Sequence, residues 1–415
     1  MNNFILSIDT SCDETSAAVT CGRRVLSNVI SSQIKIHQKY GGVYPALAKR
    51  AHQERIDFVV GEALKRAKIV IANPAGGGVK QSRDCHVVVP PPRNDSGSVS
   101  DFPLDAIAVT YGPGLAIALE VGIKKAKELA SQGEALQGFC SSTLPLIAVN
   151  HMEGHIYSTL AQNRNGIPKR ELAGPTLCLL VSGGHTELVL MKNHGQYKVL
   201  GATLDDACGE ALDKAAKILK LGYPGGPIIE RLAEEYTRKQ MSLRGVANDE
   251  AIPNDLKRLL HPLSHRVRND NHLFVLTRPL KEKDNLNFSY SGLKTQFLYL
   301  VKSLSEREFG RNLANLAASF QEAAFEQLLR KTKKAIEIYQ PKTLLCGGGV
   351  IANKYLRNLL RALAKKNNLP VFFPTSPKLV GDNAAMIGVA AGYKFERKEF
   401  VLDINSLDRE PRLSL

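Results

Sequence analysis

Two histidines four residues apart, His151 and His155, are the residues of this sequence best suited to hold a metal ion. At this spacing on a helix, both imidazoles lie on one face, about 6 Å apart, and can grip one cation. The same spacing also fits two ordinary core or surface histidines. Glu153 stands about 200° around a helix from His151, whereas the zinc-peptidase motif His-Glu-x-x-His has its glutamate directly after the first histidine. The pattern therefore fits a metal site or two ordinary histidines, and it disfavours a peptidase.

Three carboxylates stand where they could complete such a site or act on a substrate. Asp13 and Glu14 fall in a predicted hairpin turn, where they can accept hydrogen bonds from the turn backbone or hold a cation. Asp382 precedes a predicted helix and can serve as its N-cap or as a third metal ligand. Two histidines with one carboxylate leave open positions on the metal, as is typical of ferrous iron and catalytic zinc.

Glycine-rich turns indicate a second kind of site, because backbone without Cβ can approach a phosphate closely. Residues 182–186 form a predicted hairpin turn, residues 225–227 open a helix, and residues 347–349 link a strand to a helix. One such turn is ordinary, but three at element ends in one half of the chain favour nucleotide binding. Asp213 on a predicted helix face and Asn353 at a predicted helix start could be recruited by a ligand, or could be a solvated side chain and a cap.

The elements that must position these groups occur twice in the same order. Each copy is predicted to be three strands followed by a helix and further α/β alternation. This order predicts two similar mixed-sheet lobes with a cleft between them. The predicted strands and helices of the first copy are Phe4–Asp9, Ser16–Thr20, Val25–Ser31, Leu47–Lys68, Ala106–Val109 and Leu146–Val149, and those of the second are Thr176–Val181, Thr186–Met191, Tyr197–Thr203, Asp206–Lys220, Thr343–Cys346 and Val371–Phe373.

The length of 415 residues suits two lobes, each with its own core. We expect an N-terminal lobe of residues 1–150, with residues 383–415 packing back on it, and a C-terminal lobe of residues 151–382. A loop rich in Gly, Pro, Ser and Asp at about 73–103 and a charged excursion at about 257–287 are expected to be insertions.

The composition indicates where in the cell the protein is located and what kind of partner it binds. The seven cysteines form no Cys-x-x-Cys pair, which is typical of reduced thiols in a cytoplasm. No leader and no apolar stretch of about 18 residues is evident, so we expect a soluble, cytoplasmic protein without a membrane segment. The formal net charge of +15 indicates a polyanionic partner, or else a basic solvated surface.

Seven ordered motifs together resemble the tRNA N6-adenosine threonylcarbamoyltransferases, the TsaD family. The resemblance covers nearly the whole chain apart from the inserted segments. It implies an actin-like, sugar-kinase-like fold of two lobes with duplicated mixed sheets and a central cleft. The motifs are Asp-Thr-Ser-Cys-Asp-Glu-Thr at 9–15, His-Met-Glu-Gly-His at 151–155, Leu-Val-Ser-Gly-Gly-His-Thr at 180–186, Tyr-Pro-Gly-Gly-Pro at 223–227, Phe-Ser-Tyr-Ser-Gly-Leu-Lys-Thr at 288–295, Gly-Gly-Gly-Val-Ile-Ala-Asn at 347–353 and Gly-Asp-Asn at 381–383.

The resemblance also implies an activity and a set of residues. The threonylcarbamoyl group would pass from threonylcarbamoyl-adenylate to N6 of adenosine 37 in tRNA, giving t6A and AMP. His151, His155 and Asp382 would hold one divalent metal ion, for which we favour Fe²⁺ although Zn²⁺ accepts the same ligands. The adenylate in the cleft would contact Leu180, Val181, Ser182, Gly183, Gly184, Asp213, Gly226, Glu230 and Asn353. Expected partners are tRNA, a TsaB-like pseudo-enzyme paralogue and a TsaE-like small ATPase.

A general base must take up a proton from the attacking amine, and we select Asp13, with Glu14 second. Three positions depart from the family pattern: Ala46, Glu120 in a segment expected to be buried, and Glu230 where the family usually has Asp. The competing functions are a metallopeptidase, an ATPase or kinase of the same fold, and a tRNA-binding scaffold without catalysis.

Overall fold

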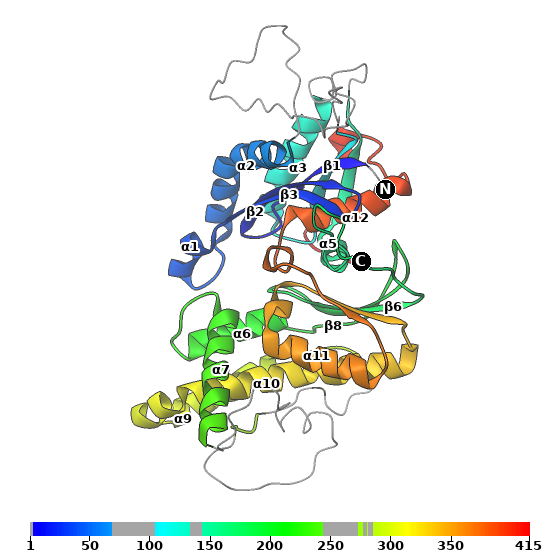
Figure 1. The fold of residues 1–415 in the computed structure, drawn as a ribbon. Helices are drawn as coiled ribbons and strands as arrows, with labels where there is room; N and C mark the ends of the chain where they lie inside the picture. Colours follow the sequence, from blue (N-terminus) through cyan, green and yellow to red (C-terminus); the bar gives the residue numbers. More distant parts are fainter. Residues whose placement is uncertain (1–2, 69–103, 133–142, 244–272, 277–279, 281–284) are drawn as a thin grey trace. The chain divides into compact units, whose positions relative to one another are not determined.

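The structure is a computed structural model that describes residues 3–68, 104–132, 143–243, 273–276, 280 and 285–415 (Figure 1). The chain divides into two compact units, one of Met1–Glu171 with Phe373–Leu415 and one of Leu172–Phe372. We call these unit 1 and unit 2. The expected insertion at 73–103 lies outside the described residues, as does most of the one at 257–287.

Unit 1 is built on a five-stranded mixed sheet in the order β3-β2-β1-β4-β5. The strands β1, β2 and β3 are antiparallel neighbours, and β4 and β5 continue the sheet parallel to β1. The strands are β1 Phe4–Asp9, β2 Glu14–Cys21, β3 Arg24–Ser32, β4 Ala106–Gly112 and β5 Leu146–Asn150. The helices are α1 Ile34–His37, α2 Pro45–Ala67, α3 Ala116–Ser131, α5 His151–Ser158 and α12 Ala384–Glu396, with 3-10 turns at Gln38–Tyr40, Pro377–Leu379 and Ile404–Ser406.

The apolar runs of β1 and β4 are buried because helices pack on both faces of this sheet. Leu6 and Ile8 of β1 belong to a core that also takes apolar side chains from α2 and α3. The helices α5 and α12 lie together, and α12 packs against β1 and β2 (Figure 1). This packing fixes the two segments that carry the predicted metal ligands.

Unit 2 repeats the same topology. Its sheet has the order β10-β9-β6-β7-β8, with β6, β7 and β8 antiparallel and β9 and β10 parallel to β6. The strands are β6 Thr176–Val181, β7 Thr186–Asn193, β8 Gln196–Ala202, β9 Thr343–Gly347 and β10 Val371–Phe372. The helices are α6 Cys208–Ile218, α7 Gly225–Leu243, α9 Ser291–Ser303, α10 Glu306–Tyr339 and α11 Lys354–Lys366, with a 3-10 turn at Gly349–Ala352.

The predicted duplication is confirmed, because both sheets place the first strand of a triplet at the centre and add two parallel strands beyond it. The strands β1 and β6 have the predicted bounds, and the other predicted strands and helices differ by a few residues at their ends. One difference has a clear cause: α2 begins at Pro45 rather than at Leu47, since proline is well suited to the first turn of a helix. The fold class is the predicted two-lobed, actin-like α/β class.

The boundaries of the two units differ from those predicted after residues 150 and 382. The helix α5 follows β5 without an intervening residue, and it packs against α12 in unit 1. Residues 151–171 and 373–382 therefore belong to unit 1, although they were expected in the C-terminal lobe. As a consequence, all three predicted metal ligands lie in one unit.

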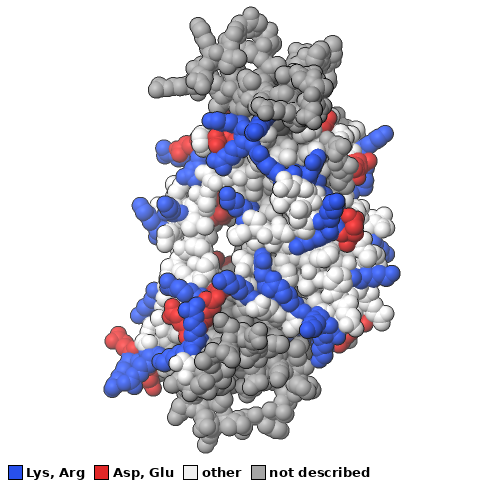
Figure 2. Space-filling view, in the orientation of Figure 1, with Lys and Arg blue, Asp and Glu red and all other residues white. Residues whose placement is uncertain are grey.

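Basic side chains are widespread on the surface. On the face seen in Figure 2, Lys and Arg of the described residues are spread between fewer acidic groups, consistent with the net charge of +15. Among the helices of the described residues, none is long and apolar enough to cross a bilayer.

Candidate functional site

The three predicted metal ligands meet between the start of α5 and the loop before α12. Nε2 of His151 lies 3.3 Å from Oδ1 of Asp382, and Nε2 of His155 lies 3.4 Å from the same oxygen. One potential ligand atom of each residue lies within 4.8 Å of the others. The two imidazoles are buried and meet edge to face, with ring centroids 4.7 Å apart. The structure thus brings together residues that are more than two hundred positions apart in the chain.

Asn150 and Asn383 fix the two helices that carry these ligands. Oδ1 of Asn150 accepts hydrogen bonds from the backbone N–H groups of Met152 at 2.8 Å and Glu153 at 3.4 Å, which caps α5 directly before His151. Asn383, and not Asp382, is the N-cap of α12, since its Oδ1 accepts from the Met386 N–H at 3.1 Å. The alternative role of Asp382 as a cap is therefore wrong, and its carboxylate is available to the histidines.

Gly154 lies between the two histidines at a close approach of α5 and α12. A Cβ at this position would lie 2.7 Å from Cδ1 of Ile387 and 3.1 Å from Cγ of Met386. A Cβ here would force the side chains of Ile387 and Met386 to shift or the two helices to separate. The glycine of the His-x-x-Gly-His segment thus permits the close packing of α5 against α12.

The polar atoms of this cluster suit a cation. Among the described residues, Nδ1 of His151 and both ring nitrogens of His155 have no hydrogen-bond partner, although both rings are buried. Burial lowers the pKa of His155, whereas at His151 the carboxylates of Asp382 and Asp9 outweigh burial and raise the pKa to about 10. The cluster therefore favours a bound positive charge, and its nitrogen and oxygen donors are those that Fe²⁺ and Zn²⁺ accept.

Glu153 does not face this cluster. Its buried carboxylate lies 3.7 Å from Nζ of Lys394 and 3.8 Å from Nη2 of Arg397, both at the C-terminal end of α12 or just beyond it. A peptidase would need this glutamate beside a metal-bound water. The ion pairs hold it elsewhere, so the structure does not support the peptidase alternative.

The predicted base residues lie in the same unit as the histidines, Asp13 in the turn between β1 and β2 and Glu14 not in the predicted turn but at the start of β2, where it pairs with Ser32 of β3. Asp13 is largely buried, and Glu14 accepts a hydrogen bond from Oγ of Ser32 at 3.2 Å. Burial raises the pKa of Glu14 well above its usual value, and the nearby carboxylates of Asp13 and Asp382 raise it further. Glu14 therefore lies within electrostatic range of Asp382.

His52 of α2 supports this turn, and the sequence analysis did not select it. Its Nε2 lies 3.0 Å from the carbonyl oxygen of Cys12, and its Nδ1 lies 2.8 Å from Oγ1 of Thr15. A carbonyl can only accept, so Nε2 carries the proton and Nδ1 accepts from the Thr15 hydroxyl. The buried ring thus connects both ends of the Asp13-Glu14 turn to α2. A buried histidine in a helix has no local signal that reveals such a contact.

The predicted nucleotide-binding turns lie close together in unit 2. A Cβ on Gly348, whose φ is +96°, would lie 2.4 Å from the carbonyl oxygen of Val181, so the turn 347–349 touches the end of β6. The backbone N–H of Gly209, in the first turn of α6, donates to the carbonyl oxygen of Ser182 at 3.2 Å. By contrast, a Cβ on Gly183, Gly184 or Gly226 would meet no atom within 4 Å. These three glycines are not required by packing, so they leave room for a ligand.

Three polar residues connect these turns to one another. Oδ1 of Asp213 accepts from the Gly225 N–H at 2.6 Å, so Asp213 is not merely a solvated side chain. Oε1 of Glu230 accepts from the Lys354 N–H at 2.7 Å, and Asn353 caps α11 through the Leu356 N–H at 3.0 Å. The capping role considered for Asn353 is confirmed. Its amide also donates to Oε1 of Gln321 at 2.8 Å.

Asp205 and Asp206 are further organising residues that the sequence analysis missed. Asp205 accepts hydrogen bonds from the hydroxyls of Ser289 and Ser291 and from the N–H groups of Tyr290 and Ser291, at 2.6 to 3.2 Å. Asp206 pairs with Lys214 at 2.5 Å and with Lys294 at 2.6 Å. The motif at 288–295 is therefore attached to the segment before α6. Two adjacent aspartates before a helix could have been read as caps but not as this tertiary contact.

Two of the three departures from the family pattern lie on helices of unit 1. Glu120 is not buried, since α3 presents it to Nζ of Lys49 at a distance of 3.0 Å, and the expectation of a buried position was wrong. Ala46 lies exposed in the first turn of α2.

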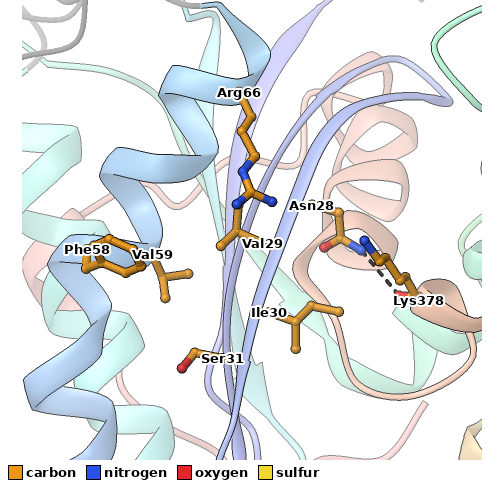
Figure 3. A pocket seen from close by; sticks show the side chains of 8 residues that line it. All are labelled: Asn28, Val29, Ile30, Ser31, Phe58, Val59, Arg66 and Lys378. Atoms are coloured by element: carbon orange, nitrogen blue, oxygen red, sulfur yellow. Dashed lines mark hydrogen bonds between the residues drawn. The ribbon is translucent and has the colours of Figure 1, made fainter.

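A cavity of about 300 Å³ in unit 1 is lined by residues 28–31 of β3, by Phe58, Val59 and Arg66 of α2 and by Lys378 (Figure 3). In this cavity, Nδ2 of Asn28 donates to the carbonyl oxygen of Lys378 at 3.2 Å. The cavity contains none of the predicted site residues, so it is separate from the His-His-Asp cluster.

The duplicated sheets and the residues they carry define a two-unit α/β protein of the actin-like, sugar-kinase-like class. A model of the family described as TsaD, tRNA N6-adenosine threonylcarbamoyltransferase, matches residues 24–74 and 99–389. The chain therefore belongs to the tRNA N6-adenosine threonylcarbamoyltransferase family.

Individual relatives are also similar to this chain over nearly its whole length. The chain is 39% identical over 388 residues to the tRNA N6-adenosine threonylcarbamoyltransferase of Syntrophotalea carbinolica, covering 93% of this chain and 90% of the relative. It is 38% identical over 413 residues to that of Clostridium novyi, covering 99% and 97%. Among solved structures, it is similar to HypF from T. kodakarensis, with a TM-score of 0.46 and 13% identity over 96% of this chain and 48% of that one.

Proposed function

We propose that this protein transfers the threonylcarbamoyl group of threonylcarbamoyl-adenylate to N6 of adenosine 37 in tRNA, giving t6A and AMP. The observation that carries the proposal is family membership over nearly the full chain, joined to the convergence of His151, His155 and Asp382. A metallopeptidase and an ATPase or kinase are not favoured, because Glu153 is held in ion pairs and the relatives are named as transferases.

His151, His155 and Asp382 would hold one divalent cation, Fe²⁺ by preference or Zn²⁺. When bound, the cation would supply Lewis-acid polarisation of the carbamoyl carbonyl. The protein's own part is to hold two imidazoles on the capped helix α5 and one carboxylate directly before the cap of α12, so that the three ligands already converge.

The adenylate would contact Leu180 to Gly184 and Gly226, where the glycines leave open space for a phosphate and an adenine nucleotide. Asp213, Glu230 and Asn353 would shape this site, since each already accepts a backbone hydrogen bond that fixes one of its turns. The mixed anhydride is an activated donor, so the departing AMP needs little acid catalysis.

Asp13 would take up the proton of the attacking amine, with Glu14 second. The amine nitrogen forms a bond to the carbamoyl carbon, the bond from that carbon to the phosphate oxygen breaks, and the proton passes to the carboxylate. Asp13→Asn is expected to lose turnover and to retain adenylate binding, measured by nucleoside analysis and by equilibrium titration. Near-normal turnover of this variant would exclude Asp13 as the base.

The net charge of +15 supports tRNA as the polyanionic partner. A TsaB-like paralogue and a TsaE-like ATPase are proposed as protein partners on the basis of the family, together with a cytoplasmic location.

The decisive experiment combines purified protein, the adenylate donor and unmodified tRNA, with and without the proposed partners, and detects threonylcarbamoyladenosine by nucleoside analysis. We expect product, and we expect His151→Ala and His155→Ala to abolish both bound metal and product. Absence of product in every combination would refute the transferase, whereas chelator-sensitive peptide cleavage or sustained ATP turnover without tRNA would revive an alternative. Salt-sensitive tRNA binding without product would indicate a scaffold.

A further inference from the structure

Asp9, the last residue of β1, is a buried carboxylate that no step described above uses. Its side chain is fully buried. Its Oδ1 accepts a hydrogen bond from the Ser11 N–H at 3.2 Å, and its Oδ2 has no hydrogen-bond partner among the described residues. Because a buried carboxylate is costly unless it is paired, this position calls for a positively charged or strongly donating neighbour.

That neighbour is His151. Oδ1 of Asp9 lies 3.7 Å from Nδ1 of His151, which itself has no hydrogen-bond partner among the described residues. The other nitrogen of the same ring, Nε2, is the one that lies 3.3 Å from Asp382. Asp9 therefore lies behind the imidazole, on the side opposite the convergence point of the three ligands.

The chemistry of imidazole assigns a role to this arrangement. A histidine that binds a cation through Nε2 carries its proton on Nδ1, and that proton needs an acceptor. We propose that Asp9 is this acceptor, a positioning residue that fixes the tautomer and orientation of His151 and strengthens its bond to the cation. The proposal rests on the metal centre proposed above.

The position of Asp9 is suited to this role because the sheet holds it rigidly. Asp9 is paired with Ser16 in the β1–β2 ladder, so its backbone cannot shift without breaking the sheet. His155 differs, since among the described residues its carboxylate contact is through Nε2 to Asp382, and its Nδ1 has no hydrogen-bond partner. The two histidines are thus unequal ligands.

Asp9→Asn tests the proposal, because asparagine keeps the size of the side chain and removes its charge. The dissociation constant for Zn²⁺, and for Fe²⁺ without oxygen, is measured on the full-length protein by competition with a chromophoric chelator. We expect binding to weaken by about 10- to 100-fold, the usual effect of losing an outer carboxylate. Asp105→Asn is the matched control. Asp105 accepts from the Phe4 N–H at 2.7 Å at the other end of β1, so its loss should leave metal affinity unchanged.

The possible outcomes separate the two proposals. Unchanged metal affinity in Asp9→Asn, with loss of binding in Asp382→Asn, would overturn the role of Asp9 and leave the metal centre intact. Absence of metal binding by the unaltered protein would overturn both. A second measurement needs no variant at Asp9: nitrogen NMR of the zinc-loaded protein with ¹⁵N-labelled histidine should show His151 bound through Nε2, with a slowly exchanging proton on Nδ1. Zinc bound through Nδ1 of His151 would overturn the proposal.

Discussion

Gly154→Ala should weaken the metal centre without touching any ligand. The new Cβ would lie 2.7 Å from Cδ1 of Ile387 and 3.1 Å from Cγ of Met386. Carbon atoms pack best at about 3.5 Å or more, so the contact with Ile387 must open by about 0.8 Å. Ile387 is fully buried, which limits the escape of its side chain. Part of the shift therefore falls on α12 and on Asp382 just before it, whereas metal sites tolerate only about 0.2 Å.

The stability change follows from two opposing effects. Overpacking a core typically costs about 1–3 kcal/mol, and replacing a helical glycine by alanine returns about 1 kcal/mol. We expect a net loss of about 0–2 kcal/mol in the free energy of unfolding by urea, and a Zn²⁺ affinity at least about 10-fold weaker, since ligand distances leave their tolerated range.

A rescue variant and a control make this prediction specific. Ile387→Val removes the Cδ1 atom that clashes, so the double variant should regain metal affinity and show a coupling of about 1 kcal/mol in a double-mutant cycle. Gly310→Ala in α10 is the control, because a Cβ there meets no atom within 4 Å. It should be neutral or stabilising, with unchanged metal binding. Wild-type affinity in Gly154→Ala, or failure of Ile387→Val to restore it, would refute the proposed spacing of α5 and α12.

Two further predictions concern charged groups outside the metal centre. Glu153→Gln removes the buried negative charge that pairs with Lys394 and Arg397, so the free energy of unfolding by urea should fall by about 1–3 kcal/mol. Neither the unaltered protein nor the variant should cleave peptides. Cleavage by the unaltered protein that this substitution abolishes would contradict the structural role of Glu153. At Asp205, partial burial opposes ionisation, but the hydrogen bonds from residues 289–291 lower the pKa. The stability that the ionised Asp205 gives to the folded protein is therefore present above its ordinary pKa of about 4. This stability is lost as the pH falls through the lowered pKa of the folded state. Asp205→Asn should flatten the decline of thermal stability between about pH 5 and pH 3, and an unchanged pH profile would show that these hydrogen bonds do not stabilise the carboxylate.

Local patterns predicted the strands and the histidine pair because both depend on neighbours in sequence. The apolar run Phe4–Asp9 ends in a polar turn, which defines a buried strand, and the spacing of His151 and His155 defines one helical face. The third ligand has no such signal. Locally, Asp382 and Asn383 are equally good caps, and only the fold shows that Asn383 caps α12 while Asp382 turns to the histidines.

The contacts missed from the sequence are those created by the sheet. Asp9 reaches His151 because β1, β4 and β5 are successive parallel neighbours, so the end of β1 and the start of α5 lie at the same edge. The sequence of a single segment does not predict the order of strands in the sheet, and a carboxylate at the end of a strand has the same pattern as an ordinary turn residue. The predicted lobe boundary after residue 150 failed for the same reason, because α5 continues directly from β5 into the unit that holds α12.

The position of one carboxylate on α5 separates this site from a peptidase. Each step along a helix rotates a side chain by about 100°, so an acid directly after the first histidine can reach a metal-bound water, and an acid one position later cannot. Here Glu153 forms ion pairs with Lys394 and Arg397, and these pairs attach α5 to the end of α12. In the proposed reaction, proton uptake would fall to a group outside the helix, and we select Asp13 in the turn before β2, with Glu14 at the start of β2 second. The helix α5 would thus carry two ligands of the proposed cation, while a separate turn, supported by His52, would carry the proposed base.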